Sequence, residues 1–297
     1  MSAKKTDFKA GFVSILGKPN VGKSTLMNAL VGERLSIMTS KAQTTRHRIF
    51  GILSRSDSQI IFSDTPGVID PKYKLQESMM RFVKASLEDA DLILYMVELG
   101  EKFDKNENLK HILKNKAPKF LVINKTDQAK GSQIIDKVNY WQEVFPLAQI
   151  FPISALEKVN IDKLYNAIRL ALPNHPPYFP EDHITDKSER FITAEIIREK
   201  IFLNYKKEVP YSCEVEIEEF KEAENILRIR AIIYVERNSQ KGIIIGKNGA
   251  SLKKVGIESR LDIEKFFEKK VHLETYVKVE KDWRKKDRSL KKFGYLQ

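Results

Sequence analysis

The feature that most constrains the fold of this chain is an eight-residue pattern near its start. Residues 17–24 read GKPNVGKS, which fits the phosphate-loop pattern GxxxxGK[ST]. The apolar run Phe12–Leu16 precedes the pattern and a helical pattern follows it. Glycines let a backbone wrap closely around phosphate oxygens, and the N-terminus of the following helix adds partial positive charge. A chance match in this strand–loop–helix context is improbable, so the pattern predicts an α/β domain that cradles phosphate.

The βαβ rhythm of this first domain extends from residue 10 to residue 172. Short apolar runs alternate with helical patterns, which predicts a mostly parallel sheet covered on both faces. Only the short segment Ser54–Ser58 joins the second and third runs, which predicts an antiparallel hairpin there. The six predicted strands are Phe12–Leu16, Ile49–Leu53, Gln59–Ser63, Leu92–Val97, Phe120–Asn124 and Gln149–Ile153.

Two loops that follow predicted strands carry groups suited to nucleotide phosphates and to a phosphate-bound magnesium ion. In the phosphate loop, Lys23 can neutralise the β- and γ-phosphates and Ser24 can give its hydroxyl to Mg²⁺. The third strand delivers the sequence DTPG, in which Asp64 can hold the metal and the Gly67 amide can sense the γ-phosphate. Alone, DTPG could be an ordinary turn, but its position after a phosphate loop favours the nucleotide interpretation.

A polar segment between the phosphate loop and the hairpin, residues 41–48 (KAQTTRHR), can bring a threonine hydroxyl to Mg²⁺ when a γ-phosphate is present. Thr45 is the first choice and Thr44 the second. The alternative interpretation is a solvated basic loop.

The sequence NKTD at the end of the fifth strand predicts which base is bound. The Asp127 carboxylate can accept hydrogen bonds from guanine N1–H and the exocyclic amine, whereas adenine offers neither donor there. Two charge-assisted bonds of about 1.5–3 kcal/mol each favour guanine by roughly 10²–10⁴. Ser154 and Ala155, after the sixth strand, would place backbone amides near guanine O6. These loops together predict a GTP site.

The second half of the chain has a different rhythm. Residues 173–180 (PNHPPYFP) contain four prolines and predict a linker. Beyond the linker the order is helix, two strands, two helices and strand, which predicts an α+β domain with a small sheet. The predicted elements are the helix Ile192–Tyr205, the strands Cys213–Glu219 and Leu227–Val235, two helices within Gly242–Phe267, and the strand Val271–Val279.

A GxxG turn, Gly246–Gly249, lies between the last two helical patterns. Such a turn brings helix N-terminal amides and a lysine against a nucleic-acid backbone, as in KH domains. A lone GxxG is more often a plain helix–turn–helix, but this element order matches the KH arrangement of bacterial type, type II. The candidate RNA-binding residues are Lys241, Ile243, Ile244, Ile245, Gly246, Lys247, Asn248, Gly249, Lys253 and Lys254, with Leu252, Val255 and Ile257 adding to an apolar floor.

The net charge and the cysteine content are consistent with an RNA-binding protein in a reducing compartment. The formal net charge of +12 favours an anionic partner, although basic proteins are common. The single cysteine, Cys213, excludes an internal disulfide and fits a reducing compartment. No stretch approaches the ~20 apolar residues of a membrane span, and the run Phe12–Leu16 is too short for a signal peptide. We expect a cytoplasmic location.

The motifs together resemble the Era family of ribosome-assembly GTPases, within the TrmE-Era-EngA-like superfamily. The resemblance rests on GKPNVGKSTL, KAQTTRHRI, DTPG, NKTD and ISA, and on FPEDHITDKSERFITAEIIREKIF and GIIIGKNGASLKKVG in the second half. It covers nearly the whole chain. It implies GTP and Mg²⁺ as ligands, small-subunit ribosomal RNA (its 3′ end) and the 30S subunit as partners, and a monomer. The implied nucleotide-site residues are Gly17, Lys18, Pro19, Asn20, Val21, Gly22, Lys23, Ser24, Thr25, Asp64, Thr65, Pro66, Gly67, Asn124, Lys125, Asp127, Ser154 and Ala155.

The resemblance also implies a slow hydrolase. Ras-like GTPases carry a water-positioning glutamine directly after the glycine of DxxG, and here that residue is Val68, which cannot orient water. Some related GTPases recruit K⁺ through the phosphate-loop asparagine, here Asn20. We carry this over as a hypothesis, which makes Asn20, Lys23, Thr45 and Gly67 the candidate catalytic residues, with Ser24, Thr45 and Asp64 as metal ligands.

Two functions compete at this point. The first is an RNA-binding GTPase switch with a GTPase domain over residues 1–175, a linker over 176–188, a KH domain over 189–280 and a basic tail over 281–297. The second is a membrane-associated signalling GTPase whose basic tail lies peripherally on anionic lipid of the inner membrane. The tail could equally be a solvated helix. A modification enzyme is a third possibility, but no Cys/His cluster supports it.

Overall fold

The computed structural model describes residues 7–103, 114–146 and 148–296. These residues divide into two compact units. The first unit contains residues up to 36, residues 45–70 and residues 79–186, and the second contains residues 37–44, residues 71–78 and residues from 187 onward. Two short segments of the N-terminal half therefore belong to the second unit.

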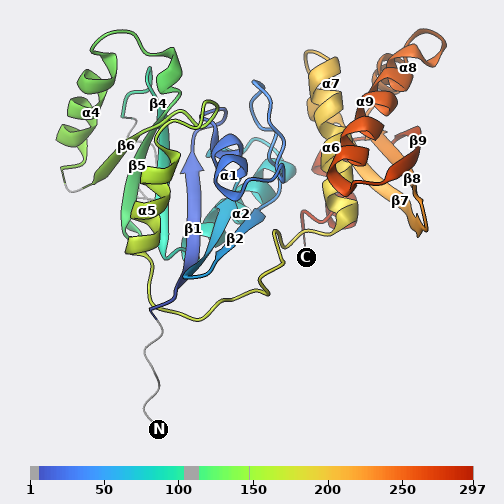
Figure 1. Ribbon diagram of the computed structural model, residues 1–297. Coiled ribbons are helices and arrows are strands. Elements are labelled where there is room, and N and C mark those ends of the chain that lie inside the picture. Colours follow the sequence, from blue (N-terminus) through green and yellow to red (C-terminus); the bar gives the residue numbers. More distant parts are fainter. Residues whose placement is uncertain (1–6, 104–113, 147, 297) are drawn as a thin grey trace. The chain divides into compact units, whose positions relative to one another are not determined.

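The first unit is built on a six-stranded sheet in the order β2-β3-β1-β4-β5-β6. The β2–β3 hairpin is antiparallel and the other neighbouring strands are parallel, as the sequence predicts. Loops after the parallel strands therefore gather at one edge of the sheet (Figure 1). The strands are β1 (Lys9–Gly17), β2 (Ile49–Arg55), β3 (Ser58–Asp64), β4 (Leu92–Glu98), β5 (Lys119–Asn124) and β6 (Gln149–Pro152).

Helices cover both faces of this sheet because successive strand side chains point to opposite sides. Ile93, Tyr95 and Val97 of β4 pack in one cluster with Val83 of α2 and Trp141 of α4. On the other face α1 packs against β1, β2, β3 and α5. The helices are α1 (Lys23–Val31), α2 (Lys74–Glu88), α4 (Gln133–Val144) and α5 (Ile161–Ala171), with a 3₁₀ turn η1 (Thr126–Gln128) after β5.

The proline-rich segment after α5 runs along the β2–β3 side of this sheet. The buried side chain of Gln59 accepts hydrogen bonds from the Tyr178 and Phe179 amides, at 2.7 and 2.9 Å, and donates one to the Phe179 carbonyl at 2.8 Å. Further along, the Ile52 amide of the edge strand donates to the Ile184 carbonyl at 2.8 Å. Residues 173–186, which belong to the first unit, thus contact its β2–β3 hairpin at several points.

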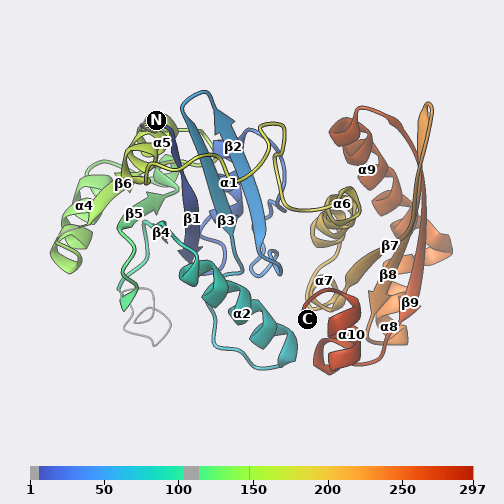
Figure 2. The same cartoon turned by 90° about the horizontal axis from the view of Figure 1, so that it is seen from below.

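The second unit has a three-stranded sheet in the order β7-β8-β9, in which β7–β8 is antiparallel and β8–β9 parallel. Helix α6 packs against β7 and α9, and α9 packs against β9, so both lie on one side of the sheet (Figure 2). The predicted element order is confirmed; the short helix α7 is an addition. The elements are α6 (Glu189–Asn204), α7 (Val209–Ser212), β7 (Glu214–Ala223), β8 (Ile226–Val235), α8 (Asn238–Ile245), η2 (Lys247–Gly249), α9 (Ala250–Phe267) and β9 (Lys270–Val279).

The basic C-terminal residues form the 3₁₀ turn η3 (Trp283–Lys285) and the helix α10 (Asp287–Lys292). Trp283 is fully buried and its indole N–H donates to the Ser212 carbonyl at 2.8 Å. Tyr295 donates to the Glu214 carboxylate at 2.6 Å. The aromatic residues of this segment therefore anchor it to the second unit. Among the described residues, no helix is both long enough and apolar enough to cross a bilayer.

Candidate functional site

The phosphate loop takes a backbone path that requires its glycines. Gly22 has φ of 99°, and a Cβ there would lie 2.2 Å from Nδ2 of Asn124. That amide nitrogen instead donates to the Val21 carbonyl at 2.8 Å. Helix α1 begins directly after Gly22, at Lys23, so its free N-terminal amides face the loop. The loop is thus shaped for a phosphate group by its own backbone.

Lys23 lies inside this loop. Its ammonium group donates to the Lys18 carbonyl at 2.9 Å and to the Gly17 carbonyl at 3.3 Å. Burial lowers the pKa of Lys23 to about 8, although the nearby Asp64 carboxylate acts in the opposite direction. A phosphate in the loop would favour the charged amine, because an anion next to a buried cation offsets its loss of hydration.

Three oxygen-bearing side chains meet next to Lys23. The Ser24 hydroxyl lies 2.7 Å from Asp64 Oδ2 and 2.9 Å from the Thr45 hydroxyl, and Thr45 Oγ1 lies 3.5 Å from the same carboxylate oxygen. Burial raises the pKa of Asp64, while the Ser24 hydrogen bond and the Lys23 charge lower it. Asp64 Oδ1 is buried and has no hydrogen-bond partner within the described part of the chain. Buried oxygens of this kind suit a small, hard cation such as Mg²⁺.

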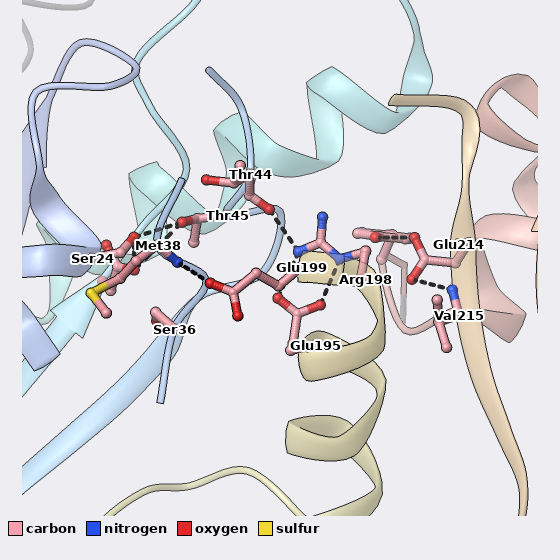
Figure 3. Close-up of polar contacts among 12 residues, drawn as sticks. Ser24, Ser36, Met38, Thr44, Thr45, Glu195, Arg198, Glu199, Glu214 and Val215 are labelled. Atoms are coloured by element: carbon pink, nitrogen blue, oxygen red, sulfur yellow. Dashed lines mark hydrogen bonds and ion pairs between the residues drawn. The ribbon is translucent and has the colours of Figure 1, made fainter. Parts of the chain in front are cut away.

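The two candidate threonines occupy different surroundings. The Thr45 hydroxyl faces Ser24, whereas the Thr44 backbone carbonyl accepts a 2.6 Å hydrogen bond from Arg198 of α6 (Figure 3). Thr44 belongs to the second unit and Thr45 to the first. Of the two, Thr45 has the hydroxyl among the oxygens of the candidate metal site.

The DTPG segment, residues 64–67, lies against the phosphate loop. The Val68 amide donates to the Gly17 carbonyl at 3.1 Å. A Cβ on Gly67 would lie 2.7 Å from the Cα and N atoms of Pro19, so only glycine fits there without a backbone shift. The Val68 side chain packs on the core cluster of β4 and α4, so it cannot position a water molecule by hydrogen bonding.

Asn124 connects the loops that would surround a guanine base. Besides its bond to Val21, its Oδ1 accepts from the Ala155 amide at 3.0 Å. The Ser154 hydroxyl donates to Asp127 Oδ1 at 2.6 Å and so orients that exposed carboxylate. The structure thus brings together loops from three distant parts of the sequence at one sheet edge.

Two acidic residues at the carboxyl ends of the parallel strands are not among those that the sequence predicts for this site. Glu98, the last residue of β4, pairs with Lys125 at 2.7 Å, and Glu101 pairs with Lys18 at 3.4 Å. Burial raises the pKa of Glu101. Neither residue belongs to a motif; the only available signal is that both follow a predicted strand end.

The remaining predicted nucleotide residues lie in the same loops. Asn20 is exposed, with φ of 67°. Thr65 donates to the Ile15 carbonyl at 3.1 Å, which ties the DTPG segment to β1. Thr25 and Pro66 lie on α1 and in the DTPG segment, respectively.

The GxxG turn of the second unit combines exposed side chains with left-handed backbone. Gly246 and Gly249 have φ of 72° and 77°, and Asn248 has φ of 52°. Lys247 and Asn248 are exposed, as are Lys253 and Lys254 on the first turns of α9. This arrangement places cations and free helix N-terminal amides on one accessible turn.

Two residues that the sequence analysis assigns to an exposed apolar floor are buried in the structure. Ile244 is completely buried, and so is Val255, so these side chains form core and not an exposed apolar floor. Ile243 and Ile257 are 49% and 45% exposed and remain accessible. The correction follows from helix geometry, since three consecutive isoleucines point in directions about 100° apart and only one can face the core.

Comparisons with known proteins agree with both halves of this description. Residues 12–125 match the family model described as 50S ribosome-binding GTPase, and residues 208–284 match the KH domain model. The chain is 45% identical over 295 residues to GTPase Era of Staphylococcus haemolyticus (strain JCSC1435), covering 98% of this chain and 99% of that protein.

Two solved structures are similar over 98% of this chain and 100% of their own. One is Era in complex with MgGDPNP and nucleotides 1506–1542 of 16S ribosomal RNA, with a TM-score of 0.93 and 41% identity. The other is a single-site variant of Aquifex aeolicus Era bound to GDP and AlF4⁻, with a TM-score of 0.94 and 40% identity.

Proposed function

Because the chain belongs to the Era family of GTPases, we propose that it is a GTP-dependent switch that binds small-subunit ribosomal RNA and assists assembly of the 30S subunit. The observation that most supports the GTP half is the Asp127 carboxylate, oriented by Ser154 and connected through Asn124 to the phosphate loop. The RNA half is supported by the exposed GxxG turn and by the Era structure that contains 16S ribosomal RNA. The RNA target that we propose is the 3′ end of the small-subunit ribosomal RNA.

In this proposal Ser24, Thr45 and Asp64 hold Mg²⁺, which would neutralise phosphate charge when bound. Lys23 supplies a further positive charge beside the phosphates, and the loop amides donate to phosphate oxygens. Thr45 is preferred over Thr44 because its hydroxyl already lies 2.9 Å from Ser24. The Gly67 amide, held next to Pro19, would respond to the γ-phosphate and so distinguish GTP from GDP.

Hydrolysis should depend on a monovalent cation. Val68 is an apolar residue packed against the core and cannot orient water, so charge at the transition state must come from elsewhere. Asn20 is exposed on the phosphate loop and offers an amide oxygen to K⁺. We expect faster GTP hydrolysis in K⁺ than in Na⁺ at equal ionic strength, and we expect Asn20→Ala to remove that difference. Equal rates of phosphate release in the two salts would refute the proposed role of K⁺.

RNA binding should depend on the GxxG turn. Gly246→Asp together with Gly249→Asp would place two carboxylates against phosphate, and we expect RNA affinity to fall at least tenfold by electrophoretic mobility shift. A Cβ at Gly246 also meets Ser251, whereas the space at Gly249 is open, so Gly249→Asp alone adds the charge without that contact, although the positive φ of Gly249 still strains the new residue. Gly131→Asp, at an open left-handed glycine of the first unit, is the matched control. Unchanged affinity in the double variant would contradict the KH interpretation.

We further propose a cytoplasmic monomer. Peripheral contact between the basic residues 281–297 and anionic lipid is the alternative role for the C-terminal segment. Co-sedimentation with vesicles that contain anionic lipid, with and without RNA as competitor, tests whether residues 281–297 bind lipid or RNA.

A further inference from the structure

Thr45, whose hydroxyl lies among the oxygens of the candidate metal site, directly follows a segment that is hydrogen-bonded to α6. Residues 37–44 belong to the second unit, and the peptide bond from Thr44 to Thr45 leads directly into the oxygen cluster with Ser24. The backbone position of Thr44 therefore influences where the Thr45 hydroxyl can lie. The contacts that fix residues 37–44 decide how freely Thr45 can move.

Arg198 is the central contact to this segment. Its side chain is 1% exposed and donates to both Glu195 carboxylate oxygens, at 2.7 and 2.6 Å, in a bidentate pair (Figure 3). The same Nη2 donates to the Thr44 carbonyl at 2.6 Å. Burial lowers the pKa of Arg198, but the Glu195 carboxylate more than offsets this and the net pKa is raised, so the group stays charged. A buried, charged and doubly anchored donor holds a carbonyl more firmly than an exposed side chain can.

Two further α6 contacts hold the same segment. Glu199 accepts from the Met38 amide at 3.1 Å. The Lys41 ammonium donates to the carbonyls of Phe202 and Tyr205, at the C-terminal end of α6. These carbonyls have no partner in their own helix, and a cation there also interacts favourably with the helix dipole.

The same end of α6 is hydrogen-bonded to the helices that flank the GxxG turn. The Tyr205 hydroxyl donates at 2.6 Å to the carbonyl of Ile244, two residues before Gly246. Asn204 donates to Glu258 of α9 at 2.5 Å, and Lys200 pairs with Asp262 of α9. Helix α6 thus contacts residues 37–44 with some side chains and both helices of the turn with others.

We propose that Arg198 is a positioning residue for Thr45, and that α6 couples the position of Thr45 to the GxxG turn through Tyr205. The inference rests on the proposed function, since it names the element by which nucleotide state would reach the RNA-binding turn. When Thr45 moves between nucleotide states, Thr44 moves with it, and the Arg198 and Lys41 contacts shift α6 or break. Because binding linkage is reciprocal, RNA on the turn should in turn favour the GTP-bound position of Thr45.

The test measures this coupling in the full-length protein. The probe is an oligoribonucleotide with the sequence of nucleotides 1506–1542 of 16S ribosomal RNA, and its Kd is measured with Mg-GDPNP and with Mg-GDP. Typical coupling changes affinity about 5- to 150-fold. We expect the ratio of the Kd with Mg-GDP to the Kd with Mg-GDPNP to lie in this range in the wild type. The ratio should be close to one in Arg198→Met with Glu195→Gln, and it should be reduced in Tyr205→Phe. Arg198→Lys should restore part of it.

The controls keep this inference separate from folding and from the proposed function. Arg190→Met changes an arginine of the same helix that donates to the Ile217 carbonyl, and it should leave the ratio unchanged. The Kd with GDP should stay within about twofold of the wild type in every variant, which a misfolded protein would not show. A wild-type ratio of one would overturn the proposed switch. A normal ratio in both the Arg198 and the Tyr205 variants would overturn this inference and leave the proposed switch standing.

Discussion

Asp127→Asn should exchange guanine specificity for xanthine specificity. In the proposed site the Asp127 carboxylate accepts hydrogen bonds from guanine N1–H and the exocyclic amine, whereas an asparagine amide would put an N–H donor opposite that amine. Xanthine carries a carbonyl at this position and can accept from the new donor. We expect GTP affinity to fall roughly 10²–10⁴-fold, as expected for the loss of two charge-assisted bonds. XTP affinity should rise by a similar factor, measured by equilibrium binding of both nucleotides.

Ser154→Ala provides the control for this exchange. It removes the 2.6 Å hydrogen bond that orients Asp127 but leaves the carboxylate in place. GTP affinity should fall by about tenfold or less, the equivalent of one side-chain hydrogen bond, with no gain in XTP binding. Retained GTP preference in Asp127→Asn would show that the base is read elsewhere.

Gly67→Ala should separate nucleotide binding from hydrolysis. The added Cβ would lie 2.7 Å from backbone atoms of Pro19, which cannot rotate away as a flexible side chain could. The DTPG segment must then move away from the phosphate loop, which would take the Gly67 amide out of the position that we propose for its contact with the γ-phosphate. Loss of one preorganised donor of this kind costs roughly 10²–10³ in rate. Single-turnover GTP hydrolysis should fall by that factor, while GDP affinity changes much less because GDP has no γ-phosphate.

Gly100→Ala is the matched control because a Cβ there meets nothing within 4 Å. It makes the same chemical change just after β4 without touching the phosphate loop. Its hydrolysis rate should equal that of the wild type. If Gly67→Ala hydrolysed GTP normally, the close approach of Gly67 to Pro19 would have no role in the reaction.

The sequence predicts those features that follow from local chemistry. The phosphate loop could be recognised because its glycines, lysine and serine lie within eight residues and follow an apolar strand. The parallel sheet follows from the alternation of strands and helices, and the GxxG turn from its position between two helical patterns. In each case a short stretch of sequence carries the required backbone conformation.

Features that depend on partners distant in the sequence could not be predicted in the same way. Nothing near Asn124 indicates that its side chain joins Val21 to Ala155, because that arrangement depends on strand order. Arg198 appears in the sequence as one more charged residue on a helix, yet it is almost fully buried against Thr44. Likewise, only the packing of α8 decides that Ile244 is the buried member of three consecutive isoleucines.

The proline-rich segment after α5 has a second consequence for the first unit. Strand β2 is an edge of the six-stranded sheet, and an uncovered edge can pair with other chains and promote aggregation. Here the Ile52 amide is occupied by the Ile184 carbonyl, and the Phe50 amide by the Asp186 carboxylate at 2.9 Å. A fragment ending at α5 would lose the groups that bind the Ile52 and Phe50 amides. It would also lose the backbone groups of Tyr178 and Phe179 that form hydrogen bonds with the buried Gln59 side chain. Residues 184–186 therefore cover the open edge of β2, and an isolated GTPase domain should extend to residue 186 to keep this edge from pairing with other chains.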